Sequence, residues 1–184
     1  EVTNIYFTND ITTNKQILVT KANKVILGQG KTLFAAEGMT YQEPNKSVLT
    51  VIKANGVKIS NLTVDADAAN TNEKDHGWDG VYAIQVYVSE NVTLDGVTLK
   101  NGDAGLLVNG STVTVNNITT SRNQFGGIEV SQGEGVTSKA TLEVTGTSSH
   151  DVEEPVYIWT IGTNAEVLDS EKQYISGADI REGK

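Results

Sequence analysis

The chain of 184 residues is long enough for one domain with a substantial core or for one stack of repeats. Hydrophobic residues make up 38% and charged residues 20%, which argues against a disordered chain, and no apolar run is long enough to span a membrane. The net charge of −9 argues against nucleic-acid binding, and the absence of cysteine excludes disulfides, thiolate catalysis and cysteine-type zinc sites.

The N-terminal residues precede a first, weak copy of a repeat. Residues 1–4 have neither a basic nor an apolar segment, so we expect no signal peptide. Residues 25–34 alternate apolar side chains with two glycines, Gly28 and Gly30, and resemble the clearer copies that follow.

One segment type recurs at residues 55–64, 90–99, 111–120 and, more loosely, 139–147. Each copy contains two pairs of alternating apolar and polar residues, which predicts two short strands with one side facing a core. Stacking the copies gives three inward columns: Val57/Val92/Val113/Leu142, Ile59/Leu94/Val115/Val144 and Leu62/Val97/Ile118.

The position between the two strands of each copy is held by Asn61, Gly96, Asn117 or Gly146. Asparagine and glycine are the residues that adopt the left-handed backbone region at low cost. We therefore expect a sharp bend at this position in every coil.

A further strand precedes each copy, at residues 48–52, 83–87, 105–109, 127–131 and 155–159. We call it the first strand of its coil, so that the two strands of the copy are the second and third. The equivalent inward residues Ile84, Leu106 and Ile128 are 22 residues apart (106 − 84 and 128 − 106). Three strands in a coil of this length predict an all-β, right-handed parallel β-helix of about six coils. The strict six-residue period of a left-handed hexapeptide helix and the leucine/asparagine frame of a leucine-rich repeat are both absent.

Longer steps between strands indicate loop insertions at residues 35–47 and 66–80. Residues 132–139 lengthen a different corner, after the first strand of their coil. We interpret residues 1–184 as a single β-helix domain. Because solenoid ends expose strand edges, we expect either the terminal segments to cover them or flanking domains of a larger surface protein to do so, and we favour flanking domains.

The coil at residues 78–99, the opening segment 5–19 and residues 24–33 that follow it resemble the pectate-lyase-like superfamily. Within it, the opening is most similar to the pectate-lyase-like adhesive domains of bacterial surface proteins. The resemblance implies the β-helix fold, contact with glycans and an extracellular setting. It does not by itself imply catalysis, because the matching residues are those that form the fold.

The predicted register places one polar and aromatic face on the outside of the first-strand sheet. Aromatic rings stack on sugar C–H faces, while amides and carboxylates pair with hydroxyls, so this face suits a glycan. A solvated sheet face with loop-covered aromatic side chains is the alternative. The predicted ligand-binding residues are Gln85, Tyr87, Asn109, Glu129, Ser131, Tyr157 and Trp159, with Trp78 and Tyr41 from overhanging loops as a wall.

A second cluster is predicted at the corner after the third strand, where Asp65, Asp67 and Asp103 come close. Carboxylates at a turn are typical Ca²⁺ ligands, so calcium is the one cofactor considered. In lyases of the resembling family, Ca²⁺ acidifies a uronate and a basic side chain removes the proton, a role that Lys100 or Arg122 would take here. Opposite charges that compensate on a solvated corner are the alternative.

The catalytic signatures of known β-helix enzymes are absent from the sequence, including paired aspartates of the hydrolase type and the lyase Arg-Pro motifs. The two histidines, His76 and His150, suggest no convincing metal site or catalytic triad. The leading hypothesis is therefore a non-catalytic glycan-binding or adhesive module of a secreted or surface-exposed bacterial protein. It binds polysaccharide or host glycan, requires no cofactor and neither binds nucleic acid nor enters a membrane.

Two other hypotheses stay open. The first is a calcium-dependent, pectate-type polysaccharide lyase that uses the aspartate corner. The second is a rigid spacer whose faces bind nothing.

Overall fold

The computed structural model describes residues 3–42, 44–70, 80–151 and 154–169, and its strands form two parallel sheets. The first-strand sheet contains β3 (Ile17–Val19), β5 (Ser47–Ile52), β7 (Tyr82–Tyr87), β10 (Ala104–Asn109), β12 (Gly126–Ser131) and β14 (Ile158–Ile161). The second, which we call the bent sheet, contains β1 (Asn4–Tyr6), β2 (Ile11–Lys15), β4 (Val25–Thr40), β6 (Lys58–Asp65), β8 (Val92–Asp95), β9 (Thr98–Lys100), β11 (Thr112–Ser121), β13 (Ala140–His150) and β15 (Ala165–Leu168).

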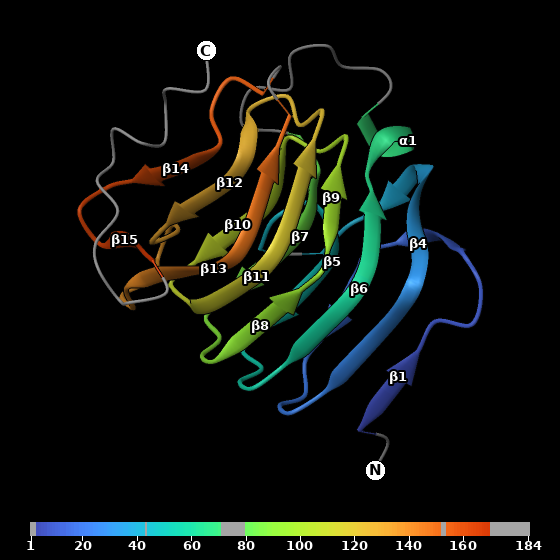
Figure 1. Ribbon diagram of the computed structural model, residues 1–184, viewed down its shortest axis with the longest axis horizontal. Coiled ribbons are helices and arrows are strands. Elements are labelled where there is room, and N and C mark those ends of the chain that lie inside the picture. Colours follow the sequence, from blue (N-terminus) through green and yellow to red (C-terminus); the bar gives the residue numbers. More distant parts are fainter. Residues whose placement is uncertain (1–2, 43, 71–79, 152–153, 170–184) are drawn as a thin grey trace.

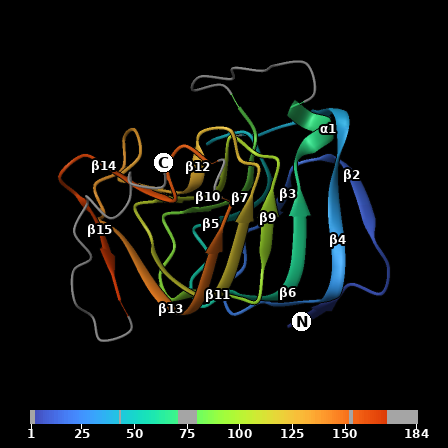
Figure 2. The ribbon, with the colours of Figure 1, turned by 45° about the horizontal axis from the view of Figure 1, so that its top comes forward.

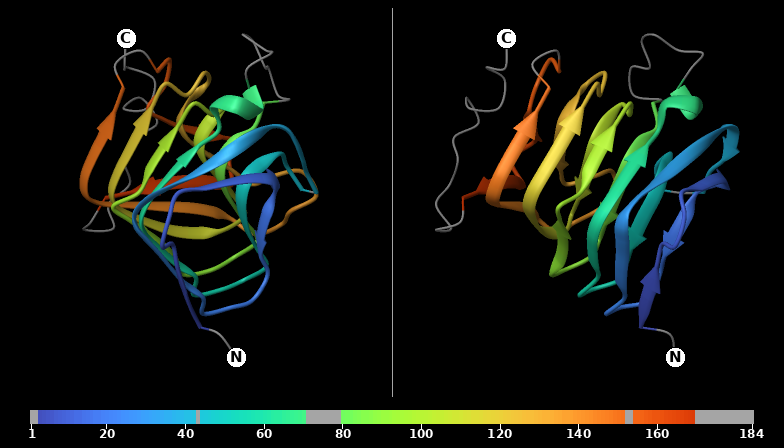
Figure 3. Two further views of the ribbon diagram at one scale, coloured as in Figure 1. Left: turned by 90° about the vertical axis from the view of Figure 1, so that its right-hand side faces the viewer. Right: turned by 45° about the vertical axis from the view of Figure 1, so that its right-hand side comes forward.

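The fold is the predicted right-handed parallel β-helix. The chain passes from a strand of the first-strand sheet into the bent sheet and returns to pair with its own previous coil (Figure 1). The two sheets carry successive coils in the same order (Figure 2). Seen along the stack, the coils superimpose around one core, and from the side they succeed one another from the N-terminal to the C-terminal end (Figure 3).

The bends of the bent sheet lie where the sequence predicts them. Asn61, Gly96, Asn117 and Gly146 all have positive φ angles, between 49° and 63°. In the first full coil, Gln29 and Gly30 do the same with φ angles of 53° and 73°. Residues that tolerate this backbone region therefore divide each long strand into two arms.

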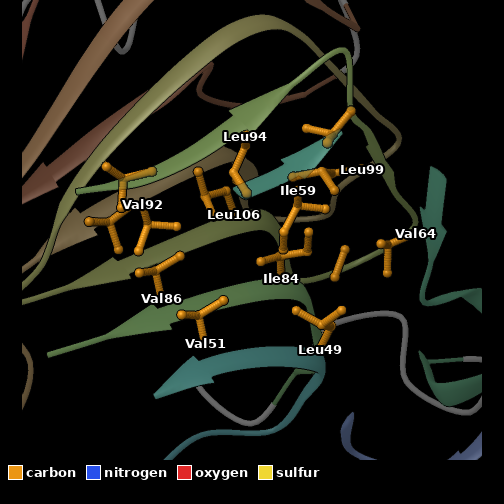
Figure 4. Packing of buried hydrophobic residues seen from close by; sticks show 14 of the residues in the cluster. Leu49, Val51, Ile59, Val64, Ile84, Val86, Val92, Leu94, Leu99 and Leu106 are labelled. Carbon is orange, nitrogen blue, oxygen red and sulfur yellow. The ribbon is translucent and has the colours of Figure 1, made fainter. Parts of the chain in front are cut away.

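The core confirms the predicted register. Leu106 pairs with Ile84 on one side and Ile128 on the other, which are the residues of the 22-residue step. Val113 likewise pairs with both Val92 and Leu142. All of these side chains are buried. Figure 4 shows Ile84, Leu106 and Val92 among the apolar side chains that pack between the sheets. In-register stacking of like side chains explains how short strands build a continuous core.

The last coil differs from the prediction. The sequence places Tyr157 beside Glu129, but the structure pairs Glu129 with Trp159, and Ser131 with Ile161. Strand β14 thus begins three residues later than the predicted strand, and its register is shifted by two. A two-residue shift keeps the apolar alternation, so periodicity alone could not detect it.

After the bend, each coil continues into the second arm of the bent sheet, which is the third strand of the coil and which we call the third arm. Its inward column becomes polar along the stack. Val64 and Leu99 are followed at the same position by Thr120 and His150. The Thr120 hydroxyl lies 2.6 Å from His150 Nδ1 and donates to Glu154 Oε2 at 2.8 Å. Asn123 Nδ2 donates to Glu154 Oε1 at 2.7 Å, so a hydrogen-bonded cluster replaces apolar packing near this end of the stack.

The N-terminal residues do not cover the first coil but belong to the stack, because β1 and β2 both pair with β4. Ile5, Tyr6 and Ile11 remain exposed there. The insertion predicted at 35–47 is shorter than expected, since β4 continues to Thr40. The insertion predicted at 66–80 begins with the short helix α1 (Asp67–Asn70), and residues 71–79 lie outside the described residues.

In the part of the chain that the structure describes, no helix is long and apolar enough to cross a membrane.

Candidate functional site: a groove on the first-strand sheet

A cavity of about 710 Å³ opens on the outer side of the first-strand sheet, and we call it the sheet groove. Strands β7, β10, β12 and β14 provide its floor, and two loops form its walls. The lining residues are Pro44, Asn45, Tyr82, Tyr87, Leu107, Asn109, Glu129, Ser131, Gln132, Gly133, Glu134 and Ile161.

The floor comes from two outward rows of the sheet. Leu107 pairs with Glu129 in one row, and Tyr87, Asn109 and Ser131 follow one another in the next. The outward direction agrees with the predicted register. The exposure does not, because Asn109, Glu129 and Ser131 are all buried at 8% exposure or less. The walls rise above the floor on both sides, so these side chains lie at the bottom of a groove rather than on an open face.

A chain of hydrogen bonds crosses the coils beneath the groove. Gln16 Nε2 in the first coil donates to the Asn45 carbonyl at 2.9 Å, and Gln85 Nε2 donates to Asn45 Oδ1 at 2.7 Å. Gln85 Nε2 also donates to Asn109 Oδ1 at 2.9 Å, and Asn109 Nδ2 donates to Ser131 Oγ at 2.8 Å. The network fixes the amide orientations along the floor, which preorganises them for a polar ligand.

Glu129 is the charged centre of the groove. Tyr82 Oη donates to Glu129 Oε2 at 3.1 Å, and Ser131 Oγ donates to Glu129 Oε1 at 3.2 Å. Burial raises the pKa of Glu129, the two hydroxyl donors oppose that change, and the negative charge of Asp103 adds to it. Burial, together with Glu129 and Asp103, also raises the pKa of Tyr82, which keeps the phenol neutral and able to donate.

The structure brings together four of the seven residues predicted on the sheet face as groove lining: Tyr87, Asn109, Glu129 and Ser131. Gln85 lies in the same sheet and holds Asn109 and Asn45 in place. Its Oε1 atom is buried and has no hydrogen-bond partner among the described residues. The predicted ligand-binding face is therefore partly a lining and partly a support beneath it.

The aromatic residues of the last coil do not line the groove. Tyr157 stacks on His150, with ring centroids 5.2 Å apart, and Trp159 lies against Phe125 at 4.1 Å. Tyr41, the predicted wall, packs against the hydrophobic core, and burial raises its pKa to about 12. Trp78 lies outside the described residues.

Sequence reasoning missed Tyr82, which lies at the start of β7. Alternation along that strand would point Tyr82 inward, together with Ile84. Instead Ala83 and Ile84 are both in the core, and Tyr82 joins Ala104 and Leu107 in a small cluster on the outer side. The adjacent apolar pair Ala83–Ile84, which matches Val48–Leu49 one coil earlier, was the available signal of this irregularity.

The predicted calcium corner is occupied by contacts within the protein. Lys100 Nζ lies 3.2 Å from Asp65 Oδ2, and Asn101 Nδ2 donates to Asp65 Oδ1 at 2.7 Å. The Asp67 amide donates to the same Asp65 oxygen at 3.1 Å. Across the described residues, no three His, Cys, Asp or Glu side chains gather in a way that could hold a metal ion. The predicted set of Asp65, Asp67 and Asp103 is thus not brought together as a metal centre.

The cluster around His150 is a second group of titratable side chains, but it is internal. Burial lowers the pKa of His150 to about 4, so the imidazole is neutral at neutral pH. Burial raises the pKa of Glu154, while hydrogen bonds from Thr120 and Asn123 oppose the change. Asn123, in the turn before β12, donates from its backbone amide to Glu154 Oε1 and from Nδ2 to the Leu99 carbonyl in the third arm. The cluster therefore joins the turn to the bent sheet, which is a structural role.

The sequence matches no family model and no curated protein. Among solved structures, it is similar to the enzymatically active domain of tailspike protein 2 of bacteriophage CBA120, with a TM-score of 0.60 and 12% identity. The match covers 90% of this chain and 26% of the tailspike chain, so this chain spans about a quarter of that protein. The two share a fold.

Two further solved structures are similar over most of this chain. A putative glycosyl hydrolase from Parabacteroides merdae has a TM-score of 0.47 and 12% identity, covering 94% of this chain and 83% of that one. A pectin methylesterase solved with a hexasaccharide has a TM-score of 0.41 and 15% identity, covering 91% of this chain and 57% of that one.

Proposed function

We propose that this chain is a non-catalytic glycan-binding module that holds a saccharide in the sheet groove. The observation that carries the proposal is the lining itself. The half-buried ring of Tyr87 lies beside the amide of Asn109, the hydroxyl of Ser131 and the carboxyl of Glu129, whereas Tyr82 is buried and contributes its hydroxyl through the bond to Glu129. An aromatic surface next to fixed donors and acceptors matches the alternating apolar faces and hydroxyl edges of a sugar.

The size and rigidity of the groove support this ligand class. A volume of about 710 Å³ accommodates a short oligosaccharide rather than a single small ion. The floor side chains are held by the network through Gln85 and Asn109, so a ligand does not have to order them on binding. The fold likeness to a tailspike domain is compatible with this role and adds nothing on the ligand.

We further propose that the module is adhesive and belongs to a bacterial protein exposed at the cell surface or secreted, flanked there by other domains. The resemblance to pectate-lyase-like adhesive domains supports this setting. An antibody against the chain should label intact cells of the source organism or its culture medium. Labelling only after lysis would contradict the proposal.

A glycan array tests binding directly. The wild-type protein should bind at least one oligosaccharide, and Tyr87→Ala should weaken that binding about three- to tenfold, the usual worth of one aromatic stacking contact. Asn109→Ala should weaken it as well, because it removes a hydrogen bond partner and loosens Ser131.

Matched controls lie away from the groove. Tyr6→Ala removes an exposed tyrosine in the first coil, and Asn116→Ala removes an asparagine on the bent sheet. Neither should change glycan binding. If the two groove variants bind like wild type, the groove is not the site; if no glycan binds at all, the rigid-spacer hypothesis replaces this one. Release of unsaturated or shortened sugar by the wild type would contradict the non-catalytic role.

A further inference from the structure

The charges that line the sheet groove have one sign. Glu129 lies in the floor and Glu134 in the wall, and none of the described lining residues is Lys, Arg or His. The negative charge of Asp103 also reaches the floor, since it raises the pKa of both Tyr82 and Glu129. The whole chain, with a net charge of −9, adds to the same negative potential.

We propose that the sheet groove selects its ligand by charge, binding uncharged sugars and excluding acidic ones, with Glu129 as the residue that sets the discrimination. The inference rests on the proposed glycan-binding function and names the ligand class of that site. It differs from what the resemblance to pectate-lyase-like proteins implies, since pectate is a polyuronate.

The physical reason lies in the position of Glu129. Its carboxyl group is buried at the floor and is bonded to two neutral hydroxyls, Tyr82 Oη and Ser131 Oγ. The hydroxymethyl group of a neutral hexose can approach these groups and exchange hydrogen bonds with them. A uronate places a second carboxylate at the same point, where two negative charges repel each other in a site of low dielectric constant.

The protonation state of Glu129 should therefore set the strength of the exclusion. The groups that act on Glu129 are Tyr82 from β7, Ser131 from its own strand and Asp103 just before β10. Glu134, from the loop after β12, lines the same groove. Burial raises the pKa of Glu129, so acidification neutralises it before an exposed glutamate would be neutralised. The penalty on acidic sugars should then shrink as the pH falls.

The test uses pairs of oligosaccharides with equal length and linkage that differ only in oxidation at C6. Suitable pairs are glucose and glucuronate oligomers, mannose and mannuronate oligomers, and galactose and galacturonate oligomers. Binding is measured by calorimetry in buffer containing EDTA, over a series of decreasing pH values that starts at about pH 7.5, because a raised pKa means that Glu129 is protonated before an exposed glutamate would be. The quantity compared is the ratio of the dissociation constants within each pair.

The expected result is that the neutral member binds at least about tenfold more tightly at the highest pH of the series. The ratio of the two dissociation constants should approach one as the pH is lowered, and it should also approach one in Glu129→Gln. Glu134→Gln, in an exposed loop, should change the ratio in the same direction and serves if Glu129→Gln does not fold. Glu143→Gln, which removes the same charge from the bent sheet, should leave the ratio unchanged.

The outcomes separate the two proposals. If the acidic member binds as tightly as its neutral partner, or if neither groove variant moves the ratio, the charge discrimination is wrong while glycan binding stands. If no member of any pair binds, glycan binding by the groove is overturned, and the discrimination with it.

Discussion

Thr120 makes two buried hydrogen bonds from a position that is otherwise apolar in the stack. The same inward column holds Val64 and Leu99 in the preceding coils, so a valine fits the backbone and the space at residue 120. Thr120→Val therefore removes the hydroxyl with little change of shape. It leaves His150 Nδ1 and Glu154 Oε2 without the partner that lies 2.6 Å and 2.8 Å away.

The expected cost follows from the burial of those partners. Glu154 is 1% exposed, and a buried polar group that loses its hydrogen bond destabilises the protein by about 1–3 kcal/mol. A loss of about 2 kcal/mol corresponds to a fall in Tm of about 4–8 °C for a chain of this size. The pKa of Glu154 should rise further, because the Thr120 hydrogen bond is one of the contacts that lower it.

Urea unfolding followed by circular dichroism gives the difference in free energy of unfolding. The control is Thr98→Val, which makes the same change in the third arm on the outward side and should stay within about 0.5 kcal/mol of wild type. A Thr120→Val protein as stable as wild type would show that the cluster contributes nothing, and the interpretation of the polar column would be wrong.

Three other perturbations test separate parts of the structure. Burial lowers the pKa of His150 from 6.5 to about 4. Between these pH values the unfolded chain binds a proton that the folded protein does not, so the free energy of unfolding is unaffected by His150 above pH 6.5 and decreases as the pH falls towards 4. Between pH 6.5 and pH 4 the free energy of unfolding, measured by urea titration, should therefore fall by up to about 3 kcal/mol more in wild type than in His150→Gln. Identical pH profiles would refute the lowered pKa of His150. Gly96→Ala should lower the free energy of unfolding by about 1–2 kcal/mol, because φ is +62° and an added Cβ would lie 2.8 Å from Asn61 Oδ1; a neutral effect in a melting curve would contradict the bend. Leu106→Ala removes a fully buried side chain between two coils and should cost about 2–5 kcal/mol in chemical denaturation, whereas a cost below about 1 kcal/mol would mean that the column is not tightly packed.

The stack could be predicted from sequence because each coil repeats the same local solution. Alternation points Val113 and Val115 inward, and Asn117 supplies the bend between the arms. Each of these features depends on the residue and its immediate neighbours, and pairing with the next coil reinforces them. Columns and bends were therefore correct wherever the repeat was regular.

The candidate site could be predicted only in part. The outward rows identify Asn109 and Glu129, but alternation places Tyr82 on the wrong side of the sheet, because the first strand contains an irregularity at its start. The loops that turn an open face into a groove make non-local contacts, such as Asn45 with Gln85, which no local pattern encodes. The predicted register of the last strand was wrong by two residues, because a shift of that size leaves the apolar pattern intact.

The most direct test of the account is a crystal structure of the protein with the neutral oligosaccharide that binds most tightly on the array. The account predicts a sugar ring against Tyr87 in the sheet groove, with hydroxyls in hydrogen-bond distance of Asn109 and Glu129. A saccharide bound on the bent sheet or at either end of the stack, with the groove free of ligand, would contradict it.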